Sequence, residues 1–363
     1  MDTLILLSER KGWNEPMNSA WPDRRMPAEW DTHERTLVSW PVRRSMCDPD
    51  NYETVCAGYE QLVRTIAAFE AVTLFVNRED EAMLSRRFSD WDAIDICVIA
   101  HDDSWVRDNG PTFVAADGAL AGINWRFNAW GEKYTPYDRD DRLAADYLAQ
   151  RGIRRIDVPL VLEGGSIHTD GCGTLLTTEQ CLLNPNRNPE LSRHEIETVL
   201  KRQLGVRHII WLKDGLPGDE TDGHVDNLAC FAAPAKVLMQ VCSDADDEGA
   251  EASRVNLEVL ASAHDADGRI IEVEPIQQPP ARFYQGRRLT LSYLNFYFVN
   301  GGLIVPVFGG DAARTDQLAL EALHRVFPDR RIQPIDGMAL VTEGGNVHCA
   351  TQQIPQINKE AHI

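Results

Sequence analysis

The sequence predicts an α/β fold in which five ββαβ-type units close into a ring. Three observations support this prediction. Helix-type apolar periodicity recurs five times, and a short strand-like run follows it each time. Turn signals typical of β-hairpins precede or complete each helix. Two copies of the motif E-G-G-x-[IV]-H, beginning at Glu163 and Glu343, fit as equivalent loops of different units.

The first unit is defined by a long amphipathic helix in residues 51–70. Its apolar stripe follows the i, i+4, i+7, i+8 spacing of one helix face and contains Val55, Tyr59, Leu62, Val63, Ile66 and Phe69. A buried strand is expected at 71–77. The unit lacks one strand of its hairpin, and the C-terminal segment 339–353, which no helix follows, can supply it.

The second and third units each begin with a hairpin. The second turns at Asp117-Gly118, a strong two-residue turn signal. Its expected elements are a hairpin at 111–127, a helix at 138–150 and a strand at 155–159. The third has a hairpin around Gly171, and its helix ends at Gly205, a natural helix C-cap. Its expected helix and strand are residues 192–204 and 206–212.

The fourth and fifth units repeat the pattern. The fourth is expected to contain a hairpin at 226–241, a helix at 251–264 and a strand at 269–275. The fifth is expected to contain a hairpin at 289–308 that turns at Asn300-Gly301, a helix at 315–327 and a strand at 330–335. Residues 1–25 are rich in polar residues, Trp and Pro without periodicity, so we expect an N-terminal tail followed by a single domain at 26–363.

Composition and charge exclude several classes of partner. The formal net charge of −20 argues against nucleic acid and anionic membranes, because phosphates would be repelled. No run reaches the length of about 20 apolar residues that a membrane helix needs. The eight cysteines are scattered without a C-x-x-C pair, so neither a disulfide framework nor a zinc site is expected. Nucleotide-binding glycine motifs are also missing. We therefore expect a reduced, cytoplasmic protein without a metal or a cofactor.

Cys349 is the candidate nucleophile. It follows Gly344-Gly345 in a polar segment, whereas the earlier copy of the motif carries Thr169 at the corresponding position. A thiol in a polar, accessible loop is of the reactive kind, and the alternative is a small buried structural residue. We expect an extended chain here, in which His348 faces away from Cys349, so both His348 and His168 are interpreted as holding their loops.

Two acidic segments are candidates for binding a cation. In "GDETDGHVDN", His224 and Asp226 are expected to share one face of an extended chain, among further acids that lack local basic partners. In "DDSWVRDNG", Asp108 lies near Trp105. The alternatives are a surface His–Asp pair and a capped loop. If the segments meet, paired carboxylates, an aromatic face and a thiol suit a planar guanidinium cation.

The chain resembles the agmatine deiminase branch of the guanidino-group-modifying enzymes, the Porphyromonas-type peptidyl-arginine deiminase family. The resemblance extends from Met26 to Pro355 and rests on several long motifs in the expected order. These are "WVRDNGPTF", "FNAWGEKYTPYD", "EGGSIH", "LLNPNRNP", "GDETDGHVDN", "SYLNFYFVNGGLIVPVFG" and "EGGNVHCATQQIP". It implies the five-bladed α/β-propeller, or pentein, fold.

The resemblance also implies roles for individual residues. The family's nucleophile falls on Cys349, its general acid/base on His224 and its two guanidinium-binding aspartates on Asp108 and Asp226. Trp105 matches the aromatic residue beside the first aspartate. Two further acidic positions, near the far end of the substrate, are matched by Glu220 and Asp222.

The activity implied is that of a hydrolase acting on C–N bonds of linear amidines. Agmatine, a small cationic guanidino compound, would be converted to N-carbamoylputrescine and ammonia through an amidino-cysteine intermediate, a step of putrescine formation. No metal or cofactor is implied. A homo-oligomer such as a dimer is compatible with the sequence. Because nearby carboxylates disfavour a thiolate, we expect the cationic substrate or protonated His224 to help ionise Cys349.

Three alternatives stay open. The first is a deiminase of free arginine or another guanidino compound, since "WPVRRSMCDPDNYE" adds Arg43 and Arg44 in a loop that could lie over the site and receive a carboxylate. The second is a non-catalytic guanidine- or polyamine-binding protein, which would need no thiol. The third is an amidinotransferase, which requires an amine acceptor in place of water.

Overall fold

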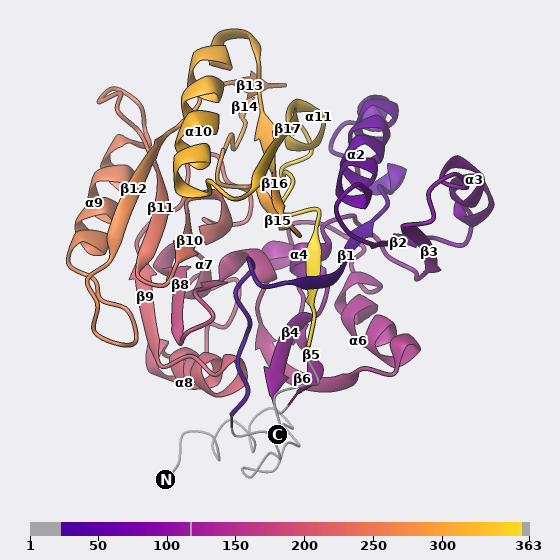
Figure 1. The fold of residues 1–363 in the computed structure, drawn as a ribbon, viewed down its shortest axis with the longest axis horizontal. Coiled ribbons are helices and arrows are strands. Elements are labelled where there is room, and N and C mark those ends of the chain that lie inside the picture. The colour runs from indigo at the N-terminus through magenta and orange to yellow at the C-terminus, as the bar shows by residue number, and fades with distance from the viewer. Residues whose placement is uncertain (1–22, 117, 358–363) are drawn as a thin grey trace.

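The computed structural model describes residues 23–116 and 118–357 and has a mixed α/β fold (Figure 1). The described strands form one four-stranded sheet, four three-stranded sheets and a two-stranded ribbon. Each of the five larger sheets joins an antiparallel strand pair to a further parallel strand, with a helix in the parallel crossover. The repeated hairpin–helix–strand pattern expected from the sequence is therefore confirmed.

The first sheet brings the two ends of the described chain together. Its strand order is β18-β1-β2-β3, with β18 antiparallel to β1 and the other pairs parallel. Its elements are β1 (His33–Ser39), α2 (Tyr52–Ala67), β2 (Val72–Val76), α3 (Glu81–Arg87), β3 (Ile94–Val98) and β18 (Gln352–Pro355). The C-terminal segment thus supplies the missing strand as predicted.

The second and third sheets follow in chain order. The second consists of β4 (Thr112–Ala116), β5 (Ala119–Arg126) and β6 (Arg154–Val161), and α6 (Asp140–Arg151) connects β5 to β6. The third contains β7 (His168–Thr169), β8 (Thr174–Thr178), α8 (Arg193–Leu204) and β9 (His208–Leu212). Ser192 and Glu195 form a capping box at the start of α8, and Gly205 ends it in the left-handed conformation (φ 68°).

The fourth and fifth sheets complete the series. The fourth contains β10 (Ala229–Ala233), β11 (Lys236–Val241), α9 (Ala250–Ala261) and β12 (Glu272–Gln277). The fifth contains β15 (Tyr297–Val299), β16 (Gly302–Val307), α10 (Ala313–Val326) and β17 (Arg331–Asp336). The ribbon between them pairs β13 (Phe283–Tyr284) with β14 (Arg287–Arg288).

Short helices lie in the loops that connect these elements. They are η1 (Arg43–Ser45), η2 (Pro49–Asn51), α4 (Val106–Asn109), α5 (Ala129–Glu132), η3 (Gly164–Ser166), α7 (Glu179–Leu182), η4 (Val225–Asn227), η5 (Gly310–Ala312) and α11 (Met338–Val341). In the view of Figure 1, α4 lies in the middle of the molecule, whereas α2, α6, α8, α9 and α10 lie toward its outside. This difference matters because α4 carries Asp108.

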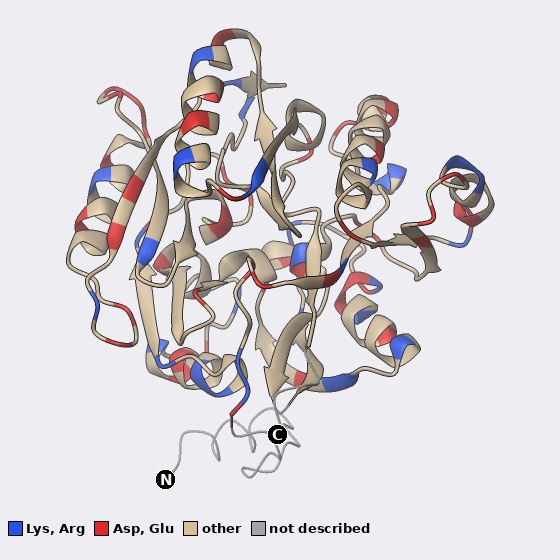
Figure 2. Cartoon of the chain, viewed as in Figure 1, with Lys and Arg blue, Asp and Glu red and all other residues tan. Residues whose placement is uncertain are grey.

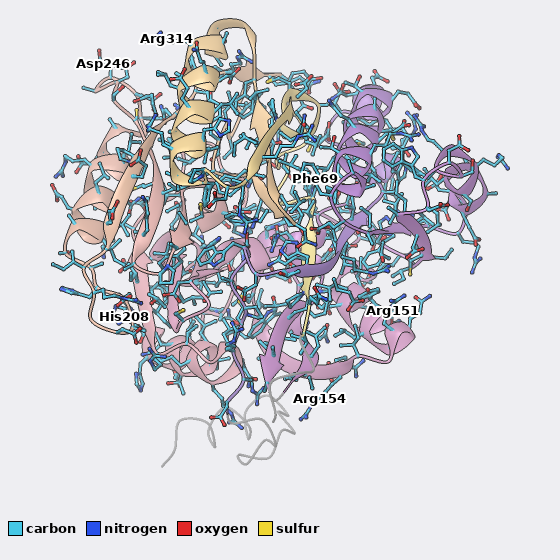
Figure 3. The ribbon with its side chains drawn as sticks, in the orientation of Figure 1. Phe69, Arg151, Arg154, His208, Asp246 and Arg314 are labelled. Carbon is cyan, nitrogen blue, oxygen red and sulfur yellow. The ribbon has the colours of Figure 1, made fainter. Side chains whose placement is uncertain are left out.

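The apolar stripe predicted for the first helix packs inward. Five of its six residues are buried, and Phe69 is half-buried against β16, where its ring lies beside Gly302. Figure 3 labels Phe69 between α2 and β16, whereas Arg151, Arg154, His208, Asp246 and Arg314 lie at the edge of the molecule. Such segregation of apolar and charged side chains is the expected result of hydrophobic burial.

Only the end of the predicted N-terminal tail lies within the described residues. Most of the predicted tail, residues 1–22, lies outside the described residues. Arg25 already pairs with Ala115 in an antiparallel bridge, and Nη1 of Arg24 donates to Oε1 of Gln203 at 2.9 Å. The packed chain therefore includes the end of the predicted tail.

Charged side chains of both signs are interspersed on the outer helices (Figure 2). Across the described residues, no helix has the length and apolar character needed to cross a bilayer.

Candidate active site

A pocket of about 470 Å³ collects residues from distant segments of the chain. Four of the seven residues predicted for the site line it, namely Trp105, Asp108, Glu220 and Cys349. The wall is completed by the loop at 45–47, by Trp130 and Tyr134, and by the glycines of the second E-G-G motif. The three segments singled out in the sequence therefore meet at one cavity.

Cys349 lies in a turn, so the prediction of an extended chain at this position is wrong. The amide of Ala350 donates to the carbonyl of Asn346 at 3.0 Å, and β18 begins only at Gln352. In the first motif copy, by contrast, β7 begins at His168 and contains Thr169, whose hydroxyl donates to the carbonyl of Thr174. The additional turn of the second copy presents the thiol to the pocket.

The histidines of the two motif copies hold their loops, as expected. His348 contacts two carboxylates, with Nδ1 2.9 Å from Oδ2 of Asp226 and Nε2 2.8 Å from Oε1 of Glu29. Burial and Arg107 oppose its protonation, but Glu29 and Asp226 raise the pKa of His348 above its ordinary value. Nε2 of His168 lies 3.6 Å from Oε2 of the same Glu29. Glu29 is thus a buried anchor that the sequence analysis missed.

His224 and Asp226 also reach the site by a different local structure from the one predicted. Residues 225–227 form the 3-10 helix η4, with His224 directly before it, so the expected extended strand start is wrong. The side chains nevertheless converge on the Cα of Gly165. A Cβ atom at Gly165 would lie 2.6 Å from Nδ1 of His224, and 2.9 Å from both Oδ1 of Asp108 and Oδ2 of Asp226. Only glycine fits between these three groups.

Asp108 and Asp226 are positioned by dedicated hydrogen bonds. Asp108 accepts one from the amide of Gly165 at 3.0 Å and one from Nε1 of Trp130 at 2.9 Å. Asp226 accepts one from His348, and its Oδ2 lies 3.6 Å from Sγ of Cys349. Nδ2 of Asn295 also donates to Sγ of Cys349, at 3.2 Å. Trp130 and Asn295 had no distinct signal in the sequence beyond lying inside long motifs.

The electrostatics of the site favour a protonated histidine and a neutral thiol. Burial opposes the charge of His224, but Asp108 above all raises its pKa well above the ordinary value. Burial, reinforced by Asp226 and Asp108, raises the pKa of Cys349 well above that of a free thiol. Burial likewise raises the pKa of Asp108 to about 6. Burial also opposes ionisation of Asp226, but His348, His224 and Arg107 together lower its pKa.

Glu163 is a further residue of the site that the sequence analysis treated only as part of a motif. Its Oε2 lies 3.7 Å from Nε2 of His224, on the side opposite Asp108, whose Oδ1 is 3.8 Å from Nδ1. Its other oxygen accepts from Nε of Arg187 at 2.6 Å. His224 therefore lies between two carboxylates, which explains its raised pKa.

Among the described residues, one group of side chains has the geometry to hold a metal ion. Ligand atoms of Glu163, Cys181 and His224 lie within 4.8 Å of one another, and all three residues are buried. A divalent ion would have to displace the proton that the carboxylates place on His224, and Arg187 already binds Glu163. The absence of a metal from the reaction therefore stays our prediction.

The two acids predicted for the far end of the substrate differ in position. Glu220 lines the pocket, accepts a hydrogen bond from Tyr134 Oη and forms an ion pair with Arg287. Asp222 pairs with Lys133 at 2.6 Å and with Arg187 at 2.9 Å. It is not among the described residues that line the pocket. These acids lack basic partners close by in the sequence, but distant segments supply such partners, so the charges of Glu220 and Asp222 are paired in the fold.

The loop that carries Arg43 and Arg44 does border the pocket, through Ser45, Met46 and Cys47. Its arginines are engaged elsewhere. Arg43 pairs with Glu53 at 2.7 Å and Arg44 pairs with Asp102 at 2.5 Å. The ion pairs of Arg43 and Arg44 therefore do not support the idea that this loop binds a substrate carboxylate.

Comparisons with known proteins agree with this geometry. Residues 25–355 match the profile of the Porphyromonas-type peptidyl-arginine deiminase family. The chain is 42% identical over 358 residues to agmatine deiminase of Ectopseudomonas mendocina, covering 91% of this chain and 95% of that protein. It is 41% identical over 358 residues to the Pseudomonas putida enzyme of the same name, with the same coverage.

A solved structure supports the same relationship. Agmatine deiminase of Enterococcus faecalis superposes with a TM-score of 0.87 at 33% identity, covering 95% of this chain and all of that one. Family match, sequence relatives and structure point the same way. The chain belongs to the Porphyromonas-type peptidyl-arginine deiminase family.

Proposed function

We propose that the protein is an agmatine iminohydrolase that converts agmatine to N-carbamoylputrescine and ammonia. The observation that carries the proposal is the convergence of His224, Asp108 and Asp226 on Gly165, with Cys349 beside Asp226. Two carboxylates, a protonated histidine and a thiol are what hydrolysis of a guanidinium needs. The relatives named agmatine deiminase support the choice of substrate.

In this proposal Asp108 and Asp226 bind the guanidinium nitrogens and keep the group cationic, so that its central carbon is electrophilic. Bidentate hydrogen bonds from a guanidinium to carboxylates are short and directional. Trp105 lines the same pocket and offers an aromatic face to the cation. The ring of Trp105 packs beside Gly345, where a Cβ atom would lie 2.6 Å from it, so the second E-G-G motif is shaped around this indole.

The first half-reaction breaks a C–N bond. The Cys349 thiolate attacks the guanidinium carbon and forms a C–S bond, which gives a tetrahedral adduct. His224 donates its proton to an amino nitrogen of this adduct, and the C–N bond breaks to release ammonia. The remaining cationic amidino group is bonded to Cys349, and His224 is left neutral.

The second half-reaction breaks the C–S bond. Neutral His224 takes a proton from water while the water oxygen attacks the amidino carbon. The C–S bond then breaks, the electron pair returns to Cys349 as a thiolate, and the hydroxyl proton passes to ammonia. The product is a substituted urea, N-carbamoylputrescine, and the thiolate and the imidazolium are restored.

The charge of the site fits activation by substrate. In the empty pocket the carboxylates Asp108 and Asp226 raise the pKa of Cys349. A guanidinium bound between them neutralises their field and places a positive charge next to sulfur, which lowers the thiol pKa. Protonated His224 assists in the same direction.

We further propose that the five sheets form the blades of a five-bladed α/β-propeller within a single domain that begins near residue 26. The shared strand order of the five sheets supports this arrangement. In Figure 1 the sheets lie around α4, which carries Asp108. Loops from several blades would then reach one central site.

The test is release of ammonia from agmatine and from arginine by the purified protein. We expect kcat/KM for agmatine to exceed that for arginine at least about 100-fold, because the pocket wall bears Glu220 where arginine would carry a carboxylate. A preference for arginine would contradict the assigned substrate. N-carbamoylputrescine must appear in the same amount as ammonia, even when other amines are added. Formation of a new guanidine from an added amine would instead indicate an amidinotransferase.

A further inference from the structure

One carboxylate of the pocket wall, Glu220, already has a cationic partner, the guanidinium of Arg287. The same carboxylate accepts a hydrogen bond from the hydroxyl of Tyr134. The acid assigned to the far end of the substrate is thus already bound to a positive charge before any ligand arrives.

Arg287 is delivered to this position by the ribbon of β13 and β14. Tyr284 and Arg287 are paired across the ribbon. The ribbon is fastened to the loop that borders the pocket, because Tyr284 Oη and Gln285 Nε2 donate to Oδ2 of Asp48 at 2.5 and 2.9 Å. Nη2 of Arg287 donates to the carbonyl of Thr342 at 2.8 Å, so its guanidinium is held independently of Glu220.

We propose that Arg287 is a specificity-determining residue that competes with the terminal ammonium of the substrate for Glu220. This inference rests on the proposed function. When agmatine binds, its ammonium takes the place of Nη1 of Arg287 at Glu220, and Arg287 stays attached to Thr342 through Nη2. Arg287 therefore reduces the advantage that a cationic tail has over a neutral tail of similar length.

The size of the effect follows from the exposure of the pair. The side chains of Arg287 and Glu220 are 30% and 24% exposed. Ion pairs in contact with solvent contribute little, so the competition is expected to change the affinity for a cationic tail about 3- to 5-fold. The exchange of partners needs no movement of the sheets, because the contacts of Arg287 with Glu220, Thr342 and Sγ of Cys47 are all made by side-chain nitrogens.

The test compares Arg287→Gln with two related variants. Arg288→Gln is the matched control, because it removes the same charge from the adjacent residue, whose partners are Asp247 and Glu248. Arg287→Lys keeps the charge. Initial rates are measured with agmatine and with n-butylguanidine, in which a hydrogen atom replaces the terminal ammonium group.

In Arg287→Gln we expect KM for agmatine to fall about 3- to 5-fold with kcat unchanged, and KM for n-butylguanidine to stay as in the wild type. Arg288→Gln should resemble the wild type with both substrates, and Arg287→Lys should restore the wild-type KM for agmatine. An unchanged or raised KM for agmatine in Arg287→Gln overturns the inference, since Arg287 would then be irrelevant to Glu220 or would position it for the substrate.

A binding measurement separates this inference from the proposed function. Agmatine is titrated calorimetrically into Cys349→Ser and into the double variant with Arg287→Gln. Tighter binding by the double variant supports the competition, and equal or weaker binding contradicts it. Failure of the wild-type protein to release ammonia from agmatine would instead contradict the proposed activity, whatever the two binding constants are.

Discussion

Sγ of Cys349 and Nδ1 of His348 both contact the same oxygen, Oδ2 of Asp226, at 3.6 and 2.9 Å. The Asp226 carboxylate therefore lies against the thiol of Cys349 and is at the same time bound by His348, the residue next to Cys349 in the chain. His348 extends the connection to Glu29, 2.8 Å from its other ring nitrogen. The position of the thiol therefore depends on the buried network of Asp226, His348 and Glu29 as well as on the backbone of its turn.

The first prediction concerns the ionisation of Cys349. In the protein without ligand, its alkylation by iodoacetamide should stay slow through neutral pH and rise only at alkaline pH, because burial, Asp226 and Asp108 raise the thiol pKa. Mass spectrometry of the peptide that contains Cys349 separates its rate from those of the exposed thiols Cys47 and Cys172.

The variant His224→Ala sharpens this measurement. Loss of the imidazolium should raise the pKa of Cys349 further, so alkylation at neutral pH should become slower still. A low thiol pKa in His224→Ala without ligand would contradict our account of substrate-assisted ionisation.

The second prediction concerns Gly165. Gly165→Ala should lower kcat/KM for agmatine by at least about 100-fold, because the new Cβ would lie 2.6 Å from Nδ1 of His224 and displace this residue, the proposed general acid. Gly152→Ala serves as the control: it ends α6 in a left-handed conformation and has open space around it, so stability should fall while kcat/KM is retained. Equal kcat/KM in wild type and Gly165→Ala would contradict this prediction, because the three side chains would then be able to move aside for the added methyl group without loss of activity.

The third prediction concerns the buried network at Glu29. Glu29→Ala should lower the free energy of unfolding by about 3 to 5 kcal/mol, because it leaves Arg107 and His348 as buried cations without this partner. Urea denaturation measures the change. Glu53→Ala, which removes the partner of Arg43 at an exposed site, should have little effect and is the control.

The pH dependence of this network has a definite sign. Burial opposes ionisation of Glu29, but His348 and Arg107 together hold its pKa well below the ordinary value. The stabilisation from a carboxylate with a lowered pKa is fully present above its unfolded value, about 4.3, and is lost as the pH falls further toward the folded value. The difference in stability between wild type and Glu29→Ala should therefore shrink in acid below about pH 4. A difference that grows on acidification would mean that Glu29 is protonated in the folded protein.

The fourth prediction distinguishes the roles of Glu220 and Asp222. Glu220→Gln should raise KM for agmatine about 10-fold with little change in kcat, because Glu220 lines the pocket and is proposed to bind the tail of the substrate, which does not react. Asp222→Asn should change KM little and stability more, because Asp222 pairs with Lys133 and Arg187 outside the pocket wall. A raised KM in Asp222→Asn would show that Asp222 reaches the substrate.

Much of the fold could be predicted because local signals were strong. The stripe of α2, the Ser192 and Gly205 caps of α8 and the turn at Asn300-Gly301 are encoded by residues close together in the chain. The missing strand of the first sheet was predicted by exclusion and was found in β18. In contrast, the backbone at His224–Asp226 and at His348–Cys349 was wrongly expected to be extended, because short turns at a site are held by distant partners.

The sequence by itself determined the repeated units, the reactive residue types and, through long motifs, the family of the chain. Only the tertiary structure decided which charges are paired: Glu220 with Arg287, Asp222 with Lys133 and Arg187, and His348 with Glu29. The physical reason is that periodicity and turn chemistry act between neighbours in the chain, whereas charge and burial act through space. The protonation states of His224 and Cys349 therefore follow from residues that the chain brings in from far away.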